Sequence, residues 1–190
     1  MRYWVVGVLA CSAAVLLASQ VDASGLRLAP FPLADGNRWT LRAVDSGAPL
    51  RITVRRSGKS FVLRGFPGTT TLRVRPWRGG VQAWDRSDRR WEPFLRLGAS
   101  VGTTYAVDLA GTSEWRSVRV EIASRHATTI DYRGTSRRDC VLVALHPNVP
   151  VADAGIEALV FAPGVGPVRV VEQSLVGPRV RLLDSYRARS

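Results

Sequence analysis

An alternation of apolar and polar residues with a period of two runs through most of this chain and restricts the fold more than any other feature. It is clearest where Trp39, Leu41 and Ala43 alternate with polar neighbours. The apolar positions of the further segments are Leu50, Ile52 and Val54; Leu72 and Val74; Val118, Val120 and Ile122; Thr128, Ile130 and Tyr132; and Val180 and Leu182. Residues two apart share one face of a strand, so each segment is predicted to be a half-buried strand.

Clusters of Gly, Pro, Asp and Ser interrupt the alternation. They fall at residues 45–49, 57–58, 66–68, 77–80, 85–88, 110–113 and 146–150. The segments between them are about six to ten residues long, which is typical of antiparallel strands joined by hairpins. No window has a convincing helical stripe. Residues 152–159 could form one short helical turn, with Asp153 as its N-cap, but the favoured interpretation is a loop entering a strand. The sequence therefore predicts one mainly β domain with little helix.

Residues 156–174 contain the clearest hairpin. An apolar run enters Pro163-Gly164-Val165-Gly166-Pro167 and leaves through a second apolar run. Pro163 presets φ for the first corner of a turn, and Gly164 and Gly166 can adopt positive φ without a Cβ penalty. We interpret Pro163, Gly164 and Gly166 as structural turn residues, since none of them can act as an acid, a base or a metal ligand.

Residues 1–23 have the composition of a secretory signal peptide. Arg2 precedes an apolar run, and Val21-Asp22-Ala23 supplies the small residues that signal peptidase requires, which predicts export and a mature chain beginning at or near Ser24. A lipoprotein signal at Cys11 is the weaker alternative, because the preceding triplet is a poor lipobox. Polar interruptions argue against a membrane anchor, and no later segment is apolar enough to span. Residues 24–190 form the predicted single domain, with 24–32 as a loosely held leader.

The chain carries a formal net charge of +12, and Lys59 is its one lysine. Arginine therefore supplies nearly all of the positive charge, and guanidinium groups bind phosphate and carboxylate through paired hydrogen bonds. Codon bias in a GC-rich genome would also favour arginine over lysine. A net field of this sign attracts polyanions whatever its origin.

Aromatic and basic residues interleave within residues 73–96. The aromatic members are Trp77, Trp84, Trp91 and Phe94, and the basic members are Arg73, Arg75, Arg78, Arg86, Arg89, Arg90 and Arg96. Such a mixture suits stacking on a base, a sugar or a lipid head group beside an anion contact. The alternative is that the tryptophans are core residues and the arginines form solvated strand faces. The candidate ligand or anion contacts are Trp77, Trp84, Trp91, Arg75, Arg86 and Arg90.

Residues able to perform catalysis are few. Those weighed are Cys140, His126, His146, Asp131, Asp153 and Glu157. Cys140 opens an apolar run and is expected to be a small buried side chain rather than a nucleophile. No G-x-S-x-G motif supports a triad with His126 and Asp131, and the two histidines without paired cysteines argue against zinc. We therefore expect no catalytic residue, no metal and no cofactor.

Several motifs resemble a family of uncharacterised secreted bacterial β-proteins. They are Phe31-Pro32-Leu33 followed by Gly36 and Trp39, Arg138-Asp139-Cys140, Ala152-Asp153-Ala154-Gly155, and Ala162-Pro163-Gly164-Val165-Gly166. The resemblance covers about residues 31–183. It implies a single antiparallel, strongly curved sheet, either a half-barrel similar to periplasmic lipoprotein carriers or a sandwich-like arrangement. Relatives often have a second cysteine where this chain has Val151, so the resemblance implies that Cys140 has lost a disulfide partner.

These features predict an exported, non-enzymatic module that binds an anionic or amphipathic component of the envelope. One alternative is a periplasmic carrier that holds a lipid-like ligand in the concavity of the sheet, and another is a hydrolase with unidentified residues. Apolar side chains lining an open concave face would favour the carrier. A polar cleft pairing His126 or His146 with a carboxylate would favour the enzyme. The signal peptide argues against nucleic acid as the physiological partner.

Overall fold

The structure, a computed structural model, describes residues 30–112, 114–147, 154–175 and 177–189. The predicted signal peptide and Asp153 lie outside these residues. Within them the regular elements are all strands: β1 (Arg38–Ala43), β2 (Pro49–Ser57), β3 (Ser60–Arg64), β4 (Thr71–Trp77), β5 (Gly80–Asp85), β6 (Arg90–Leu95), β7 (Thr104–Val107), β8 (Val118–Ile130), β9 (Ser136–Pro147), β10 (Ala154–Ala162), β11 (Gly166–Ser174) and β12 (Arg179–Arg187). In this part of the chain no helix has the length and hydrophobicity needed to cross a bilayer.

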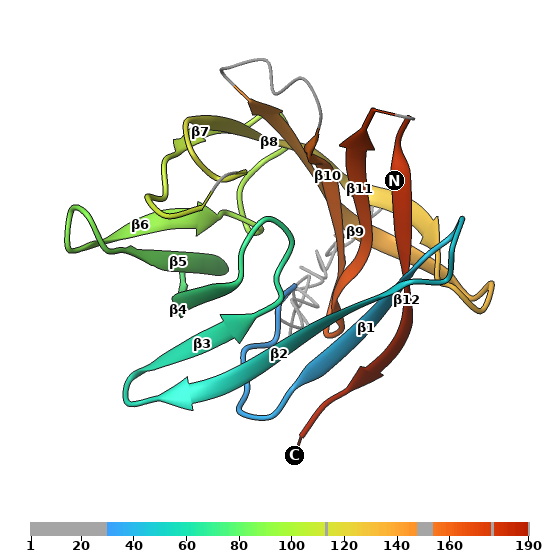
Figure 1. The fold of residues 1–190 in the computed structure, drawn as a ribbon, viewed down its shortest axis with the longest axis horizontal. Coiled ribbons are helices and arrows are strands. Elements are labelled where there is room, and N and C mark those ends of the chain that lie inside the picture. The colour runs from blue at the N-terminus through green and yellow to red at the C-terminus, as the bar shows by residue number, and fades with distance from the viewer. Residues whose placement is uncertain (1–29, 113, 148–153, 176, 190) are drawn as a thin grey trace, which may run out of the picture.

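The twelve strands form one antiparallel sheet with the order β6-β5-β4-β3-β2-β1-β12-β11-β10-β9-β8-β7. Every neighbour along the chain is also a neighbour in the sheet except at β6 and β7, which form its two edges, and β1 pairs with β12. Figure 1 shows the sheet curling round so that β6 and β7 come near each other. This nearly closed, strongly curved sheet confirms the predicted fold class.

A tyrosine side chain links the two edges of the sheet. The hydroxyl of Tyr105 on β7 donates to the carbonyl oxygen of Phe94 on β6 at 3.2 Å and accepts from the backbone N–H of Arg96 at 3.0 Å. Exposed strand edges leave backbone groups unpaired. Tyr105 therefore satisfies one backbone group of β6 and one group of the residue that directly follows the strand.

Alternation places the predicted apolar residues on the concave side along most strands. Leu72 and Val74 on β4 are buried next to the exposed Arg73 and the half-buried Arg75. On β8, Val118, Val120 and Ile122 are buried and alternate with the exposed Arg119 and the half-buried Glu121. The sheet thus has an apolar inner side and a polar, arginine-rich outer side, as a half-buried antiparallel sheet requires.

At the end of β8, the prediction that Thr128, Ile130 and Tyr132 face the core is wrong by one residue. Ile130 and Tyr132 are 55% and 41% exposed, whereas Thr129 and Asp131 are 6% and 7% exposed. The β8–β9 pairing shifts register three times between Ile122 and Thr129, and β8 ends at Ile130. Each irregularity offsets the two-residue period, because a slip of one residue turns side chains to the opposite face.

The hairpin of residues 156–174 forms by pairing of β10 with β11. Gly164 and Gly166 have φ of 70° and 99°, and the backbone N–H of Val165 donates to the carbonyl oxygen of Ala162 at 3.1 Å. Trp39 on β1 reaches this turn, since its Nε1–H donates to the carbonyl oxygen of Val165 at 2.5 Å. The turn is therefore tied to the first strand as well as to its own two strands.

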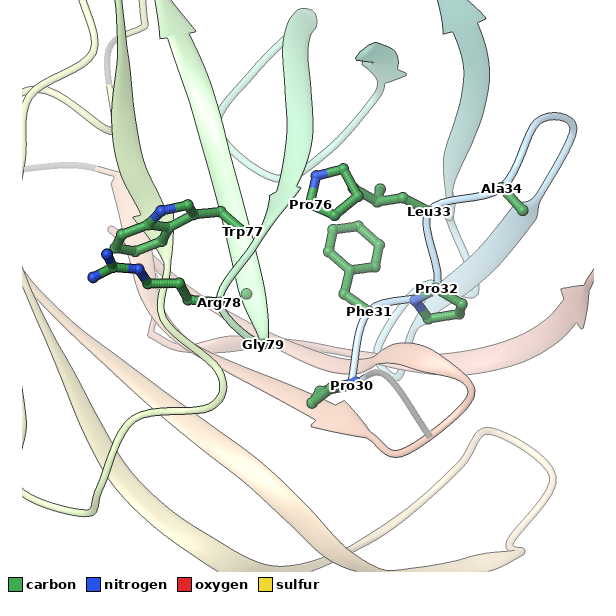
Figure 2. A pocket seen from close by; sticks show the side chains of 10 residues that line it. Pro30, Phe31, Pro32, Leu33, Ala34, Pro76, Trp77, Arg78 and Gly79 are labelled. Atoms are coloured by element: carbon green, nitrogen blue, oxygen red, sulfur yellow. The ribbon is translucent and has the colours of Figure 1, made fainter. Parts of the chain in front are cut away.

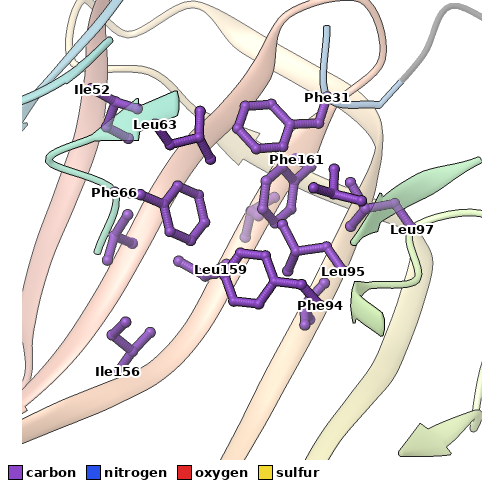
Figure 3. Packing of buried hydrophobic residues seen from close by; sticks show 14 of the residues in the cluster. Phe31, Ile52, Leu63, Phe66, Phe94, Leu95, Leu97, Ile156, Leu159 and Phe161 are labelled. Carbon is purple, nitrogen blue, oxygen red and sulfur yellow. The ribbon is translucent and has the colours of Figure 1, made fainter. Parts of the chain in front are cut away.

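Aromatic side chains fill the concave side of the sheet. Phe31 lies at the centre, with its ring 5.5 Å from Trp39, 5.9 Å from Phe66 and 5.7 Å from Phe161 between centroids. Figure 3 shows these phenylalanines converging with leucines from several strands. The prediction of a loosely held leader is wrong at Phe31, which is 5% exposed, because its ring supplies part of the core.

Candidate anion-binding site

Alternation brings two arginines and two tryptophans together on the outer face of β4, β5 and β6. Arg73 and Arg75 point away from the core because Leu72 and Val74 point into it. On the neighbouring strands Trp84 and Trp91 are directly opposite each other in the β5–β6 pairing. We call Arg73, Arg75, Trp84 and Trp91 the outer cluster.

The tryptophan rings pack against both guanidinium groups of the outer cluster. Trp84 and Trp91 meet edge to face, with 5.4 Å between centroids. The Cζ of Arg75 lies 4.5 Å from the Trp91 centroid, and the Cζ of Arg73 lies 5.7 Å from Trp91 and 6.0 Å from Trp84. These are distances at which a ring quadrupole attracts a cation. The aromatic surfaces are therefore engaged by the protein's own cations.

Neutral acceptors hold one edge of each guanidinium. Arg73 Nε–H donates to Ser60 Oγ and Arg75 Nε–H donates to Gln82 Oε1, both at 2.8 Å. Ser60 and Gln82 are 2% and 8% exposed, so these acceptors are fixed by their surroundings. Among the described residues, no carboxylate forms a salt bridge with Arg73 or Arg75. Both side chains are thus oriented without loss of their charge.

The outer cluster belongs to a segment that contains no acidic residue. Between Asp45 and Asp85 the sequence has no Asp or Glu and eight cations: Arg51, Arg55, Arg56, Lys59, Arg64, Arg73, Arg75 and Arg78. Arg55 lies opposite Val62, and Val62 lies opposite Arg73, so the positive charge continues from the outer cluster across β3 to β2. Like charges on one face raise the local potential that an anion experiences.

The structure gathers three of the six predicted contact residues, Arg75, Trp84 and Trp91, and separates the other three. Arg90 forms salt bridges with Asp88, at 3.1 Å, and with Glu92, so its charge is compensated. Arg86 is exposed in the turn between β5 and β6. Arg86 and Arg90 therefore lie outside the outer cluster, and whether any of the six residues contacts a ligand stays a prediction.

Trp77 lies at the end of β4 in a different environment. Its ring is near Arg78, 5.2 Å from Cζ, and near Arg96, 5.7 Å from Cζ. It lines an apolar pocket of about 510 Å³ formed by residues 30–34 and 76–80. Figure 2 shows Phe31 and Pro76 facing each other in this pocket, with Trp77 and Arg78 side by side at its margin.

Sequence reasoning missed Ser60 and Gln82, and it left Arg73 out of the contact set. A local signal for Gln82 exists. Arg78 and Gly79 both have positive φ, which is the geometry of a two-residue hairpin turn, and such a turn fixes Arg75 opposite Gln82. Ser60 has no comparable signal, because a longer loop separates β3 from β4.

The residues weighed for catalysis do not come together. Cys140 is fully buried, and burial raises the pKa of its thiol. His126 pairs with Asp139 at 3.0 Å, but the two side chains are 84% and 74% exposed. His146 pairs with Glu121 at 3.1 Å on the neighbouring strands β9 and β8. These His–carboxylate pairs lie on strand surfaces, and Glu157 is exposed on β10.

Asp131 has a structural set of partners. It accepts from the backbone N–H groups of Arg133 and Thr135 and from Arg137 Nη2 at 3.1 Å. Burial alone would raise its pKa, but these hydrogen bonds and the nearby guanidinium hold the pKa below its ordinary value. Asp131 therefore closes the β8–β9 turn. Among the described residues, no group of three His, Cys, Asp or Glu side chains is arranged to hold a metal ion.

No family model matches the chain, and comparisons with curated proteins and with solved structures find no significant match. What the protein binds therefore has to be inferred from its own residues.

Proposed function

We propose that the protein is an exported, non-enzymatic module that binds an anionic component of the cell envelope on the outer face of β2–β6. The observation that carries the proposal is the outer cluster, in which Arg73 and Arg75 are held in place by neutral groups and by tryptophan rings. Orienting a cation costs conformational entropy. A pair already oriented, without a carboxylate partner among the described residues, is suited to an external anion.

The packing of the concave side supports the outer face as the binding surface. Carriers of lipid-like ligands need an open, apolar interior, whereas Phe31, Phe66 and Phe161 occupy the interior here. Burial of these rings contributes to folding in proportion to the apolar area removed from water. Opening the interior for a ligand would sacrifice that contribution, while binding on the outer face leaves the core intact.

A binding experiment with a polyanion tests the proposal. The mature chain is titrated with polyphosphate and with polyglutamate at several salt concentrations. The double variant Arg73→Ser/Arg75→Ser is compared with Arg119→Ser/Arg138→Ser, which removes two exposed arginines from β8 and β9. The outer-cluster variant should lose markedly more affinity than the matched control for both polymers. Equal losses would mean that net charge alone attracts the polymers, and the proposed site would be wrong.

The apolar pocket beside Trp77 favours a second candidate, a carrier of a small amphipathic molecule. Its volume of about 510 Å³ and its lining by Phe31, Pro76 and Trp77 suit a short apolar chain near the cations of Arg78 and Arg96. Mass spectrometry of molecules that copurify with periplasmically expressed protein tests this candidate. A stoichiometric amphipathic ligand that is lost in Trp77→Ala would support it, and retention in that variant would contradict it.

Export is part of the proposal and is tested separately. N-terminal sequencing of protein recovered from the envelope should begin at or near Ser24, as the sequence of residues 21–23 predicts. An intact Met1 or an acylated Cys11 would contradict a cleaved secretory signal.

A further inference from the structure

We propose that Arg73 and Arg75 form a clamp for a phosphoryl group, which specifies the ligand class of the binding site proposed above and therefore rests on that proposal. The probe chemistry is a tetrahedral oxyanion with two negative charges, such as a phosphomonoester. Gln82 and Ser60 act as positioning residues. Each accepts a hydrogen bond from the Nε–H of one arginine, so these acceptor oxygens orient the guanidinium and are not themselves ligand contacts.

The number and placement of the guanidiniums favour phosphate over carboxylate. Arg73 and Arg75 are two residues apart on β4, so their Cα atoms are about 6.6 Å apart on the same face of the strand. Both guanidiniums contact the ring of Trp91. With the Nε edges occupied, the Nη groups of both arginines are left for a ligand. One guanidinium is enough for the two oxygens of a carboxylate, whereas the several oxygens of a phosphoryl group can accept from two guanidiniums at once.

The tryptophans contribute by restricting the arginines rather than by stacking on a ligand. Arg75 lies over Trp91 at 4.5 Å, and Arg73 lies near Trp84 as well as Trp91. A sugar or base could reach these ring faces only by displacing the guanidiniums. The cluster therefore favours a phosphoryl group presented from solvent over a planar ring inserted between the tryptophans.

The clamp predicts a chemical preference that net charge does not. Inorganic phosphate is titrated into the mature protein, and binding is detected by nuclear magnetic resonance of the arginine Nε–H groups. Sulfate and acetate are titrated in the same way at matched ionic strength. Phosphate should shift the Nε–H signals of Arg73 and Arg75, assigned from single Arg→Lys variants, and should bind about tenfold more tightly than acetate. Equal affinity for phosphate and acetate would overturn the clamp.

Variants that preserve charge separate the clamp from the general binding site. Arg73→Lys and Arg75→Lys should each weaken phosphate binding about tenfold, because lysine lacks the planar, paired donors. Arg119→Lys and Arg138→Lys, on β8 and β9 outside the proposed face, are matched controls and should change phosphate binding less than about twofold. If the lysine variants of the clamp bind phosphate as the wild type does, the clamp is wrong while polyanion binding by the face can still hold. If neither of the two serine double variants loses affinity for the polyanions, the proposed function itself is wrong.

Gln82 provides the sharpest test of positioning. Gln82→Glu keeps an acceptor for Arg75 Nε–H but adds a carboxylate that neutralises the arginine, so phosphate affinity should fall at least as far as in Arg75→Lys while the melting temperature stays near that of the wild type. Gln82→Leu removes the acceptor and should weaken phosphate binding with no change in binding of polyglutamate. Wild-type phosphate affinity in Gln82→Glu would show that Arg75 does not contact the ligand.

Two sources could present the phosphoryl group, a lipid head group and a soluble phosphomonoester. Vesicles containing phosphatidic acid and vesicles containing phosphatidylglycerol are compared at equal surface charge, alongside inorganic phosphate in solution. Stronger binding to phosphatidic acid than to phosphatidylglycerol, or specific binding of soluble phosphate, supports recognition of a dianionic phosphoryl group and identifies its source. Absence of both preferences overturns it.

Discussion

Replacing Gly166 with alanine should destabilise the protein more than the same change at any open turn glycine. Gly166 has φ of 99°, and a Cβ built on it would lie 3.0 Å from Nε1 of Trp39 and 3.2 Å from Cε2 and Cζ2. Trp39 cannot move aside easily. Its ring is buried, stacks on Tyr186 at 5.2 Å and donates a hydrogen bond to the carbonyl oxygen of Val165.

The magnitude has two parts that a matched glycine separates. Gly111 has φ of 79° with no atom within 4 Å of an added Cβ, so Gly111→Ala measures the backbone cost alone, about 1–2 kcal/mol. Gly166→Ala adds displacement of a packed ring, an overpacking cost of about 1–3 kcal/mol. In a domain of this size 1 kcal/mol shifts Tm by about 2–4 °C. Gly166→Ala should therefore lower Tm by about 4–20 °C and Gly111→Ala by about 2–8 °C.

Thermal and urea unfolding of the variants, followed by near-UV circular dichroism, measures both costs. Trp39→Phe removes the ring atoms that the new Cβ would meet. In the Trp39→Phe background, Gly166→Ala should therefore cost no more than Gly111→Ala, which makes the two positions strongly coupled. Equal Tm values for Gly166→Ala and Gly111→Ala in the wild-type background would refute the contact with Trp39 and the rigidity assigned to the hairpin.

Two further predictions concern Cys140 and Tyr105. Cys140 is fully buried with a raised thiol pKa, so the folded protein should resist thiol reagents, and Cys140→Ala should cost about 1 kcal/mol with anion binding unchanged; rapid labelling under native conditions would contradict this. Burial raises the pKa of Tyr105 to about 12, although its hydrogen bond from the Arg96 backbone and the Arg96 charge act in the opposite direction. Because the folded state then holds the phenol proton more tightly than the unfolded state, the stability linked to this group is complete below about pH 10 and is lost as the pH rises through about 12. Urea unfolding across this range should show that loss in the wild type and a smaller loss in Tyr105→Phe, and identical profiles would mean that the Tyr105 phenol is not buried in the folded protein.

The strands were predictable wherever the two-residue period was unbroken, and the errors have a definite cause. Leu72 and Val74 face the core as predicted, because β4 pairs regularly with both neighbours. Ile130 faces solvent because three register shifts precede it along β8. Bulges depend on how two distant strands adjust to the curvature of a sheet, so no residue type within β8 announces them.

The outer cluster and its two neutral acceptors, Ser60 and Gln82, were only partly predictable, because together they come from four strands. The hairpins of β4–β5 and β5–β6 are local, so turn geometry could have placed Gln82 opposite Arg75, and the neighbouring Asp88 and Glu92 could have removed Arg90 from the set. Ser60 needed the register of β3 against β4, which a longer connection leaves open. Trp77 shares its strand with Arg75 but turns toward a different pair of arginines at the strand end.

The basic outer face follows from the way the core is built. Each apolar residue committed to the concave side of β2, β3 and β4 forces its sequence neighbours outward, and in residues 46–84 those neighbours include arginines and no acid. Charges on this face therefore have no carboxylate of the same segment to pair with. They are compensated by mobile counterions or by a bound anion, and release of counterions favours a ligand that carries several charges close together. Oriented guanidiniums at Arg73 and Arg75 would add a geometric preference to that general attraction, which is why charge-preserving variants are a more decisive test of the site than charge removal.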